Sequence, residues 1–298
     1  MAVGNFDGVH LGHAAISRRL RQAADLAGVP AVALSFDPHP AAIVRPASAP
    51  VPLTTPARRA ELLLALGLDA VLVQPTDEAL LALEPAAFYA FMLRDRLAAV
   101  AIVEGRDFRF GAGRAGDVGL LAGLAAADRA TVDVVEPVLV DGEPVSSSRL
   151  RRLVAAGDVA EAIRLGTAPH RATGRVVAGA RRGAGLGFPT ANLAEIATLL
   201  PAAGVYAARA VVAGTTYAAA VNVGPAPTFD SIANTVEAHL IGFAGDLYDR
   251  VLHVDFLERL RDTRRFASVE DLKTQLAEDV ARAAVVAGSP AATIARET

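Results

Sequence analysis

The chain has 298 residues, 53% hydrophobic and 20% charged, which predicts two globular domains rather than a disordered protein. A formal net charge of -3 gives no electrostatic basis for nucleic-acid binding, and zero cysteines exclude disulfides and thiolate metal sites. The N-terminus lacks a basic region followed by an apolar core, and Gly, Pro and Asn divide the uncharged stretch 210–229, so we expect a cytoplasmic protein without a membrane segment.

The most informative stretch comes first. Residues 4–13 read Gly-Asn-Phe-Asp-Gly-Val-His-Leu-Gly-His, directly after the apolar run 1–3 and before a helical pattern over 16–26. A strand, a glycine turn and a helix start together predict a phosphate site. The reason is that glycines let the backbone approach a ligand, while free N–H groups at a helix N-terminus favour an anion.

His10 and His13 lie in that turn, and their spacing places both rings on one side of a helical segment. There they would donate hydrogen bonds to the phosphoryl oxygens of a nucleotide as negative charge develops during displacement. For an arbitrary His-x-x-His, a pair of surface or metal-binding histidines is the alternative. The neighbouring Asp7, Gly8 and Gly12 favour the nucleotide interpretation.

Apolar strands then alternate with amphipathic helices. We expect strands near 29–36, 70–73, 100–103 and 132–140, and helices over 56–66 and 86–97, the first capped by Thr55. This order predicts a mostly parallel, doubly wound sheet that binds ligands at the carboxyl ends of its strands.

Two segments after these strands carry unusual residues. Residues 104–117 are rich in glycine and arginine, which suits a mobile flap over a charged ligand, with a solvated turn as the alternative. Residues 145–151 read Val-Ser-Ser-Ser-Arg-Leu-Arg and lead into a helix that reaches Leu165 with an interruption near Gly157. Such a serine cluster can simply cap the helix.

The composition becomes β-branched and glycine-rich after the first 168 residues, so we place the domain boundary near Pro169. Short alternating runs then predict a small antiparallel barrel; they cover 174–177, 205–212, 217–223, 236–243 and 252–256. A final helix begins after Ser268, with Asp271 at capping-box distance. Residues 289–298 are expected to be a disordered tail.

Within the predicted barrel, the glycine-rich basic loop 179–187 leads into Gly-Phe-Pro-Thr-Ala-Asn at 187–192. Thr190 and Asn192 alternate in an extended segment, so both side chains can reach a Mg²⁺ ion held mainly by substrate phosphates. A proline turn with capping side chains is the alternative. Further on, Glu237 lies in an otherwise apolar strand, and we expect its neighbour His239 to be packed or hydrogen-bonded rather than catalytic.

These motifs resemble those of prokaryotic bifunctional riboflavin kinase/FAD synthetases. The first glycine motif and the Ser-Ser-x-Arg-x-Arg pattern resemble the adenylylating module, within the His-x-Gly-His nucleotidylyltransferase superfamily. Gly-Phe-Pro-Thr-Ala-Asn and the Gly-x-x-Pro-Thr-Phe run at 224–229 resemble riboflavin kinases. The resemblance implies a Rossmann-like FMN adenylyltransferase domain over 1–168 and a riboflavin kinase barrel with a terminal helix over 169–288.

The implied enzyme phosphorylates riboflavin to FMN with ATP in the barrel and adenylylates FMN to FAD, with pyrophosphate release, in the first domain. The resemblance implies that Glu237 is the general base of the kinase and that Mg²⁺ assists both reactions. Implied ligand-binding residues of the first domain are Gly4, Phe6, Asp7, Gly8, Gly12, Asp107, Phe110, Ser147, Ser148, Arg149 and Arg151. Those of the barrel are Gly179, Gly187, Pro189, Thr190, Asn192 and Arg261, with Phe266 beside the flavin.

Flavins and ATP are the expected partners, without nucleic acid or membrane, and the protein is expected to be a monomer or weak homo-oligomer. The family has an additional segment before the first glycine motif, where only three residues stand here. Because of this departure, the alternative remains that the protein is a riboflavin kinase only, with a first domain reduced to a flavin-binding or regulatory module. A nucleotidylyltransferase for another phosphate ester with an unrelated barrel is a third reading, but it leaves 187–192 unexplained.

Overall fold

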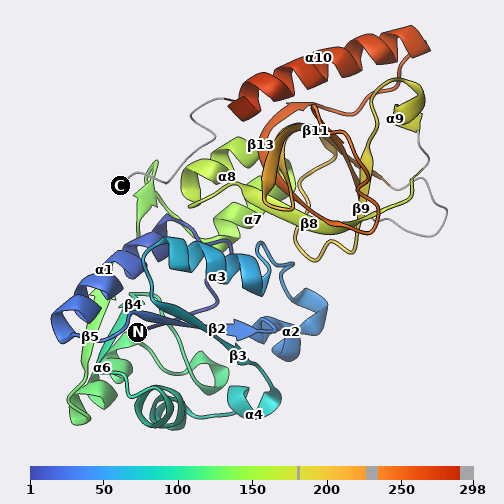
Figure 1. The fold of residues 1–298 in the computed structure, drawn as a ribbon. Helices are drawn as coiled ribbons and strands as arrows, with labels where there is room; N and C mark the ends of the chain where they lie inside the picture. The colour runs from blue at the N-terminus through green and yellow to red at the C-terminus, as the bar shows by residue number, and fades with distance from the viewer. Residues whose placement is uncertain (180–181, 226–233, 289–298) are drawn as a thin grey trace. The chain divides into compact units, whose positions relative to one another are not determined.

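The computed structural model describes residues 1–179, 182–225 and 234–288. The chain forms two compact units: unit 1 comprises Met1–Pro50 and Pro56–Ser147, and unit 2 comprises Val51–Thr55 and Ser148–Thr298 (Figure 1). Within the described ranges, no helix has the length and apolar character needed to cross a membrane. The expected tail at 289–298 lies outside the described residues.

Unit 1 is built on a parallel sheet. The strands β1 (Ala2–Val3), β2 (Val32–Asp37) and β3 (Ala70–Pro75) pair in parallel, as do β4 (Ala101–Gly105) and β5 (Thr131–Val135). The Met1 ammonium donates to the Ala101 carbonyl, and Val103 N–H donates to Met1 O at 2.9 Å, so β1 is joined to β4. The resulting order β3-β2-β1-β4-β5 confirms the predicted doubly wound sheet and puts its switch point between β1 and β4.

Helices cover both faces of this sheet because successive strand residues point to opposite sides. Ala2 packs on one face with α1 (Leu11–Ala27) and α3 (Pro56–Ala65), whereas Val3 packs on the other. That second face is covered by α5 (Pro85–Phe88), η2 (Tyr89–Arg96) and α6 (Val118–Ala127). Shorter helices are α2 (Pro40–Val44), η1 (Pro46–Ser48), α4 (Glu78–Leu81) and η3 (Ala112–Arg114).

Two predicted elements of unit 1 differ in detail. The helix expected over 86–97 is present, but its second part, η2, has π-helical hydrogen bonding. The strand expected over 132–140 is wrong as a single element: β5 stops at Val135, and Leu139–Val140 form β6, which pairs with β7 (Glu143–Pro144). The reason is Pro137, which has no N–H to donate to a sheet.

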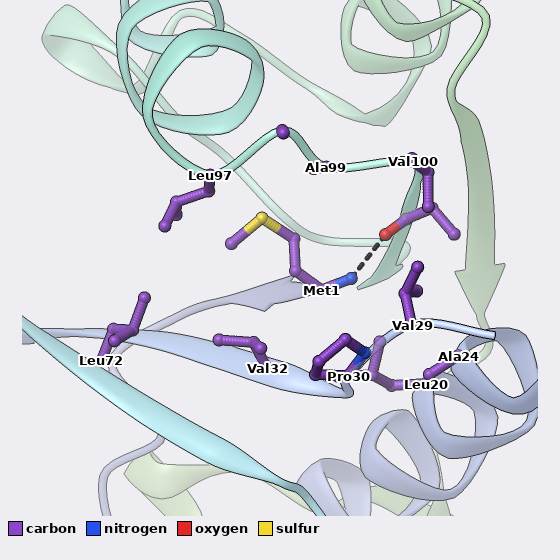
Figure 2. Close-up of a pocket in the computed structure, with 12 residues that line it drawn as sticks. Met1, Leu20, Ala24, Val29, Pro30, Val32, Leu72, Leu97, Ala99 and Val100 are labelled. Carbon is purple, nitrogen blue, oxygen red and sulfur yellow. Dashed lines mark hydrogen bonds between the residues drawn. The ribbon is translucent and has the colours of Figure 1, made fainter. Parts of the chain in front are cut away.

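An apolar cavity of about 280 Å³ lies at the amino end of this sheet, beside Met1 (Figure 2). It is lined by side chains of α1, β2, β3 and the segment before β4. Burial lowers the pKa of the Met1 ammonium to about 6, although the nearby Glu104 acts in the opposite direction. Ligands of doubly wound sheets bind at the carboxyl ends of the strands, so this cavity is not part of the site described below.

Unit 2 contains a closed antiparallel barrel with the strand order β10-β11-β12-β9-β8-β13, which confirms the predicted barrel (Figure 1). Alternate residues fill its interior; on β12 these are Val236, Ala238 and Leu240. The strand expected over 236–243 ends at Leu240, where Gly242 turns the chain with φ of 76°. The strands are β8 (His170–Val177), β9 (Ala191–Ala194), β10 (Gly204–Val212), β11 (Thr215–Pro225), β12 (Asn234–Leu240) and β13 (Val251–Arg261).

Helices flank the barrel. The predicted interrupted helix is confirmed as α7 (Ser147–Ala156) and α8 (Val159–Leu165), separated at Gly157, where φ is 82°. The long helix α10 (Val269–Gly288) packs against β10, β11 and β13. Its predicted cap is also confirmed, because Asp271 N–H donates to Ser268 Oγ at 3.1 Å. The short helix α9 (Arg182–Gly185) lies within the glycine-rich loop.

Candidate active sites

In unit 1, a strained turn connects β1 to α1. Gly4 N–H still donates to Leu34 O at 3.0 Å, as a strand residue would. The chain then turns through three residues with positive φ: Phe6 at 48°, Gly8 at 82° and Val9 at 30°. Such φ values are costly for Phe and Val, and their buried side chains offset this cost. The turn delivers His10 to the N-cap position of α1.

The predicted histidines lie together at this helix start. The rings of His10 and His13 stack with centroids 3.7 Å apart, and Phe6 packs edge-on against His13. His13 Nδ1 accepts the His10 backbone N–H at 3.2 Å, so the proton of the neutral His13 ring is on Nε2. His10 Nδ1 is buried and has no hydrogen-bond partner among the described residues. In the His13 ring, Nε2–H is therefore the group that can donate to a ligand.

Burial makes both imidazoles weak bases. It lowers the pKa of His10 to about 4, against the opposing effect of Asp107 and Asp7. Burial also lowers the pKa of His13 well below its usual value, and the neighbouring His10 and Arg59 contribute. At pH 7 the two rings are neutral, so they can stack without charge repulsion and still donate hydrogen bonds to phosphoryl oxygens.

A buried polar network supports the turn. The Asp7 carboxylate lies 3.8 Å from the guanidinium of Arg59, and the two residues are 2% and 5% exposed. Arg59 also donates to Ser35 Oγ at 2.8 Å, while Ser147 Oγ donates to Asp7 O at 2.7 Å. Arg59 is not among the residues predicted from the sequence, although an arginine four residues before Leu63 on the apolar stripe of α3 is a signal for such a role.

The other predicted residues of the first domain occupy different surroundings. Gly12 lies beside the His10 ring, which a Cβ would approach to 3.1 Å. Phe110 is 5% exposed and packs with Phe88 and Phe108 in the sheet core rather than in the turn. The remaining predicted residues, Ser148, Arg149 and Arg151, follow Ser147 in α7 but belong to unit 2.

In unit 2, a pocket of about 250 Å³ lies between the barrel and α10. Glu237 lines it from β12, and the strand register pairs this residue with Asn222 of β11 on one side and Asn192 of β9 on the other. Because Val236 and Ala238 fill the barrel interior, Glu237 stands on the outer face, half-buried. A carboxylate is therefore flanked by two amides, of which Asn222 is not among the residues predicted from the sequence.

The glycine-rich loop packs tightly on the predicted Thr190-Ala191-Asn192 segment. A Cβ on Gly179 would lie 2.1 Å from Asn192 Nδ2, and Gly183 and Thr190 both line the pocket. His239 Nδ1 is hydrogen-bonded to Pro189 O at 2.8 Å, which confirms that this histidine has a hydrogen-bonded role. Gly187, with φ of 89°, turns the chain into this segment.

The rest of the pocket lining combines apolar side chains with charged ones, among them the carboxylate of Asp279. It includes Arg261 and Phe266, to which the resemblance assigns a place beside the flavin, together with Arg264. Apolar side chains of α10 complete it; they are Leu272, Leu276 and Val280. The loop at 226–233, which contains most of the predicted Gly-x-x-Pro-Thr-Phe run, lies outside the described residues.

The donor atoms of this pocket fit a magnesium ion that is held mainly by phosphate. Across the described ranges, no group of three or more His, Cys, Asp or Glu side chains could hold a metal ion by itself. Thr190 and Asn192 offer a hydroxyl and an amide oxygen, which are hard ligands suited to Mg²⁺. With so few protein ligands, Mg²⁺ would complete its coordination with substrate phosphates and water.

Comparison with known families agrees with this two-part organisation. The family model for FAD synthetase matches residues 1–149, and the one for riboflavin kinase matches residues 166–287. The chain therefore consists of a flavin adenylylating module followed by a flavin-phosphorylating module.

Curated relatives contain both modules. A bifunctional riboflavin kinase/FMN adenylyltransferase from Pseudomonas fluorescens is 40% identical over 291 residues, which cover 97% of this chain and 93% of the relative. The protein of the same description from Escherichia coli K12 is 34% identical over 280 residues, 94% of this chain and 90% of the relative. The chain belongs to the family of bifunctional riboflavin kinase/FMN adenylyltransferases, which confirms the resemblance seen in the sequence.

A solved structure has the same fold. The crystal structure described as a macrolide-efflux protein from Streptococcus pneumoniae has a TM-score of 0.85 and 30% sequence identity to this chain. The match covers 97% of this chain and 93% of that one. Its description names a different activity from that of the curated relatives, and the likeness shows the fold that the two chains share.

Proposed function

We propose that the pocket of unit 2 phosphorylates riboflavin to FMN with ATP, and that the turn of unit 1 adenylylates FMN to FAD with a second ATP. The observation that carries the first assignment is Glu237, a carboxylate held between Asn192 and Asn222 on the wall of a pocket. The second assignment rests on the neutral, stacked pair of His10 and His13 at the N-terminus of α1.

In the kinase reaction, Glu237 accepts the proton of the riboflavin 5′-hydroxyl as that oxygen attacks the γ-phosphorus of ATP. The new P–O bond forms while the bond to the bridging oxygen breaks, and ADP leaves. Asn192 and Asn222 orient the carboxylate from the two neighbouring strands. Thr190 and Asn192 would hold Mg²⁺, which when bound neutralises charge on the phosphates.

In the adenylyl transfer, an FMN phosphate oxygen attacks the α-phosphorus of ATP and pyrophosphate leaves. His10 and His13 donate hydrogen bonds to the α-phosphoryl oxygens, with the free N–H groups at the start of α1. Since both rings are neutral, they stabilise the developing charge as hydrogen-bond donors rather than as cations. We assign Ser148, Arg149 and Arg151 to the binding of the leaving pyrophosphate. One guanidinium group can donate hydrogen bonds to two phosphate oxygens at once and also neutralises their charge.

We also propose domain limits of 1–168 and 169–288. The same proposal covers a cytoplasmic location and a monomeric or weakly associating state. Size-exclusion chromatography with light scattering tests the oligomeric part: a tight oligomer at micromolar concentration would refute it.

The two sites are tested separately with purified protein, Mg²⁺ and ATP, given riboflavin in one tube and FMN in another. Glu237→Gln should slow FMN formation by roughly 10²–10⁴-fold and leave FAD formation from FMN unchanged. The double variant His10→Asn/His13→Asn should do the reverse. Glu195→Gln is the control, because the Glu195 side chain is 76% exposed, and it should change neither reaction.

Chelation of Mg²⁺ by EDTA should stop both reactions, and added Mg²⁺ should restore them. Loss of both activities from either site variant would contradict the assignment of two independent sites. A wild-type protein that makes FMN but converts no FMN to FAD would instead support the reading in which unit 1 only binds flavin or nucleotide.

A further inference from the structure

The helix α10 buries a charged group against the barrel. Asp279 is 1% exposed and lies within the apolar stripe formed by Leu276, Val280 and Ala283. Its carboxylate accepts hydrogen bonds from Arg261, through Nε at 3.0 Å and Nη2 at 2.7 Å, and from Gln275 Nε2 at 3.0 Å. A buried carboxylate is costly unless it is paired and hydrogen-bonded, and here both requirements are met.

The same network continues to the pocket wall. Gln275 Oε1 accepts a hydrogen bond from Arg264 Nη2. The guanidinium carbons of Arg261 and Arg264 lie 5.7 Å and 5.1 Å from the centroid of the Phe266 ring. Asp279 thus reaches one guanidinium directly and the other through Gln275, and both contact the same aromatic ring.

The chemistry of the pocket separates two parts of a flavin substrate. The hydroxyl that reacts must lie at Glu237, whose neighbours Asn222 and Thr190 are polar. An aromatic face flanked by guanidinium groups suits a flat, conjugated ring system, through stacking and cation–π contacts. The ring system of the substrate therefore belongs at Phe266, and its hydroxylated chain at Glu237.

We propose that Asp279 is a positioning residue for the flavin ring: it fixes Arg261 and, through Gln275, Arg264, and thereby sets the orientation of the Phe266 face. The inference rests on the proposed kinase function of this pocket. Asp279 does not touch the reacting atoms, so it acts on flavin affinity and not on phosphoryl transfer. If the ion pair between Asp279 and Arg261 only held α10 against β13, its loss would instead lower the stability and change all kinetic parameters together.

The test uses the full chain and the variant Asp279→Asn, which keeps the shape but removes the charge. We expect the KM for riboflavin and the dissociation constant measured by riboflavin fluorescence to rise about tenfold. The kcat, the KM for ATP and the FMN-to-FAD reaction should stay within about twofold. Glu278→Gln is the matched control: this neighbour on α10 is exposed, and its change should affect nothing.

A second pair of variants separates positioning from folding. Gln275→Ala removes the link to Arg264 together with one hydrogen bond to Asp279, and it leaves the ion pair of Asp279 with Arg261 in place. It should raise the riboflavin KM and leave kcat and the KM for ATP unchanged. In a Phe266→Leu background, Asp279→Asn should have little further effect on riboflavin affinity, because the two changes act through one ring.

Three results would overturn the proposal. These are an unchanged riboflavin affinity in both the Asp279 and Gln275 variants, a parallel rise in the KM for riboflavin and ATP, and full additivity with Phe266→Leu. Failure of the proposed kinase function is distinguishable, because wild-type protein would then make no FMN while the binding measurements still decide the role of Asp279.

Discussion

The neutral state of His10 has a measurable consequence for how unit 1 responds to pH. Burial lowers the pKa of this ring from 6.5 to about 4 in the folded protein. When the pH falls through 6.5, the unfolded chain binds a proton that the folded chain does not, so the folded state loses stability on acidification. The loss grows until the pH reaches the folded pKa of about 4.

The size of this effect follows from the two pKa values. One pKa unit corresponds to about 1.4 kcal/mol, so the full difference would be about 3 kcal/mol below pH 4. Between pH 7 and pH 5, where the unfolded imidazole becomes mostly protonated and the folded one does not, the loss is about 2 kcal/mol. His10→Gln should abolish this part of the pH dependence, whatever its effect on stability at pH 7.

The assay has two parts. Proton NMR of the histidine ring protons, of which the chain has 6 sets, gives the pKa of each ring, and His10→Gln assigns the one of interest. Hydrogen exchange in β2 at pH 7 and pH 5, corrected for intrinsic exchange, then gives the change in the opening free energy of unit 1. His253→Gln is the control, since His253 lies on β13 of unit 2 and should leave the exchange of β2 unchanged.

A ring titration of His10 with a midpoint near 6.5 would refute the argument, because it would mean that the turn does not desolvate the imidazole. So would a His10→Gln protein whose β2 opening energy falls between pH 7 and pH 5 by as much as that of the wild type, because both proteins keep the contribution of the buried His13 and only the wild type has that of His10.

Two further substitutions test the packing of each site. Gly179→Ala should slow the kinase reaction about tenfold or more. The added Cβ would lie 2.1 Å from Asn192 Nδ2, so the Asn192 side chain would have to move out of its position beside Glu237. Gly185→Ala is the control and should leave the kinase rate unchanged, because no atom lies within 4 Å of its added Cβ. Equal steady-state rates of FMN formation in the Gly179 and Gly185 variants would contradict this prediction. Arg59→Met removes the cation beside the buried Asp7 and should cost unit 1 about 3 kcal/mol. Thermal unfolding measures this loss, and an unchanged midpoint would exclude it.

Much of the chemistry could be predicted from sequence because it depends on neighbours along the chain. The three-residue spacing of His10 and His13 at a helix start brings their rings to one side, as their stacking confirms. The alternation of β12 similarly predicts that Glu237 and His239 share a face, away from the barrel interior. Pro137 in the sequence also indicates that the strand ends before it, although the strand was predicted to continue to residue 140.

The pairings across the chain could not be predicted in this way. Asp279 of α10 forms an ion pair with Arg261 of β13, 18 residues earlier in the chain. Arg59 of α3 lies beside Asp7 in the turn before α1. Phe110 lies in a motif that indicates a ligand site, yet its ring fills the core between the sheet and its helices. In each case the sequence shows a charged or aromatic residue, but not its partner.

The sequence by itself determined the alternation of strands and helices, the two motif sets and the residue types at each site, because periodicity and turn chemistry are local properties. Only the tertiary structure decided that Asn222 and Asn192 flank Glu237, and that Asp279 supports the Phe266 wall of the pocket. These pairings depend on strand register and barrel closure, which the burial of apolar surface over the whole unit selects.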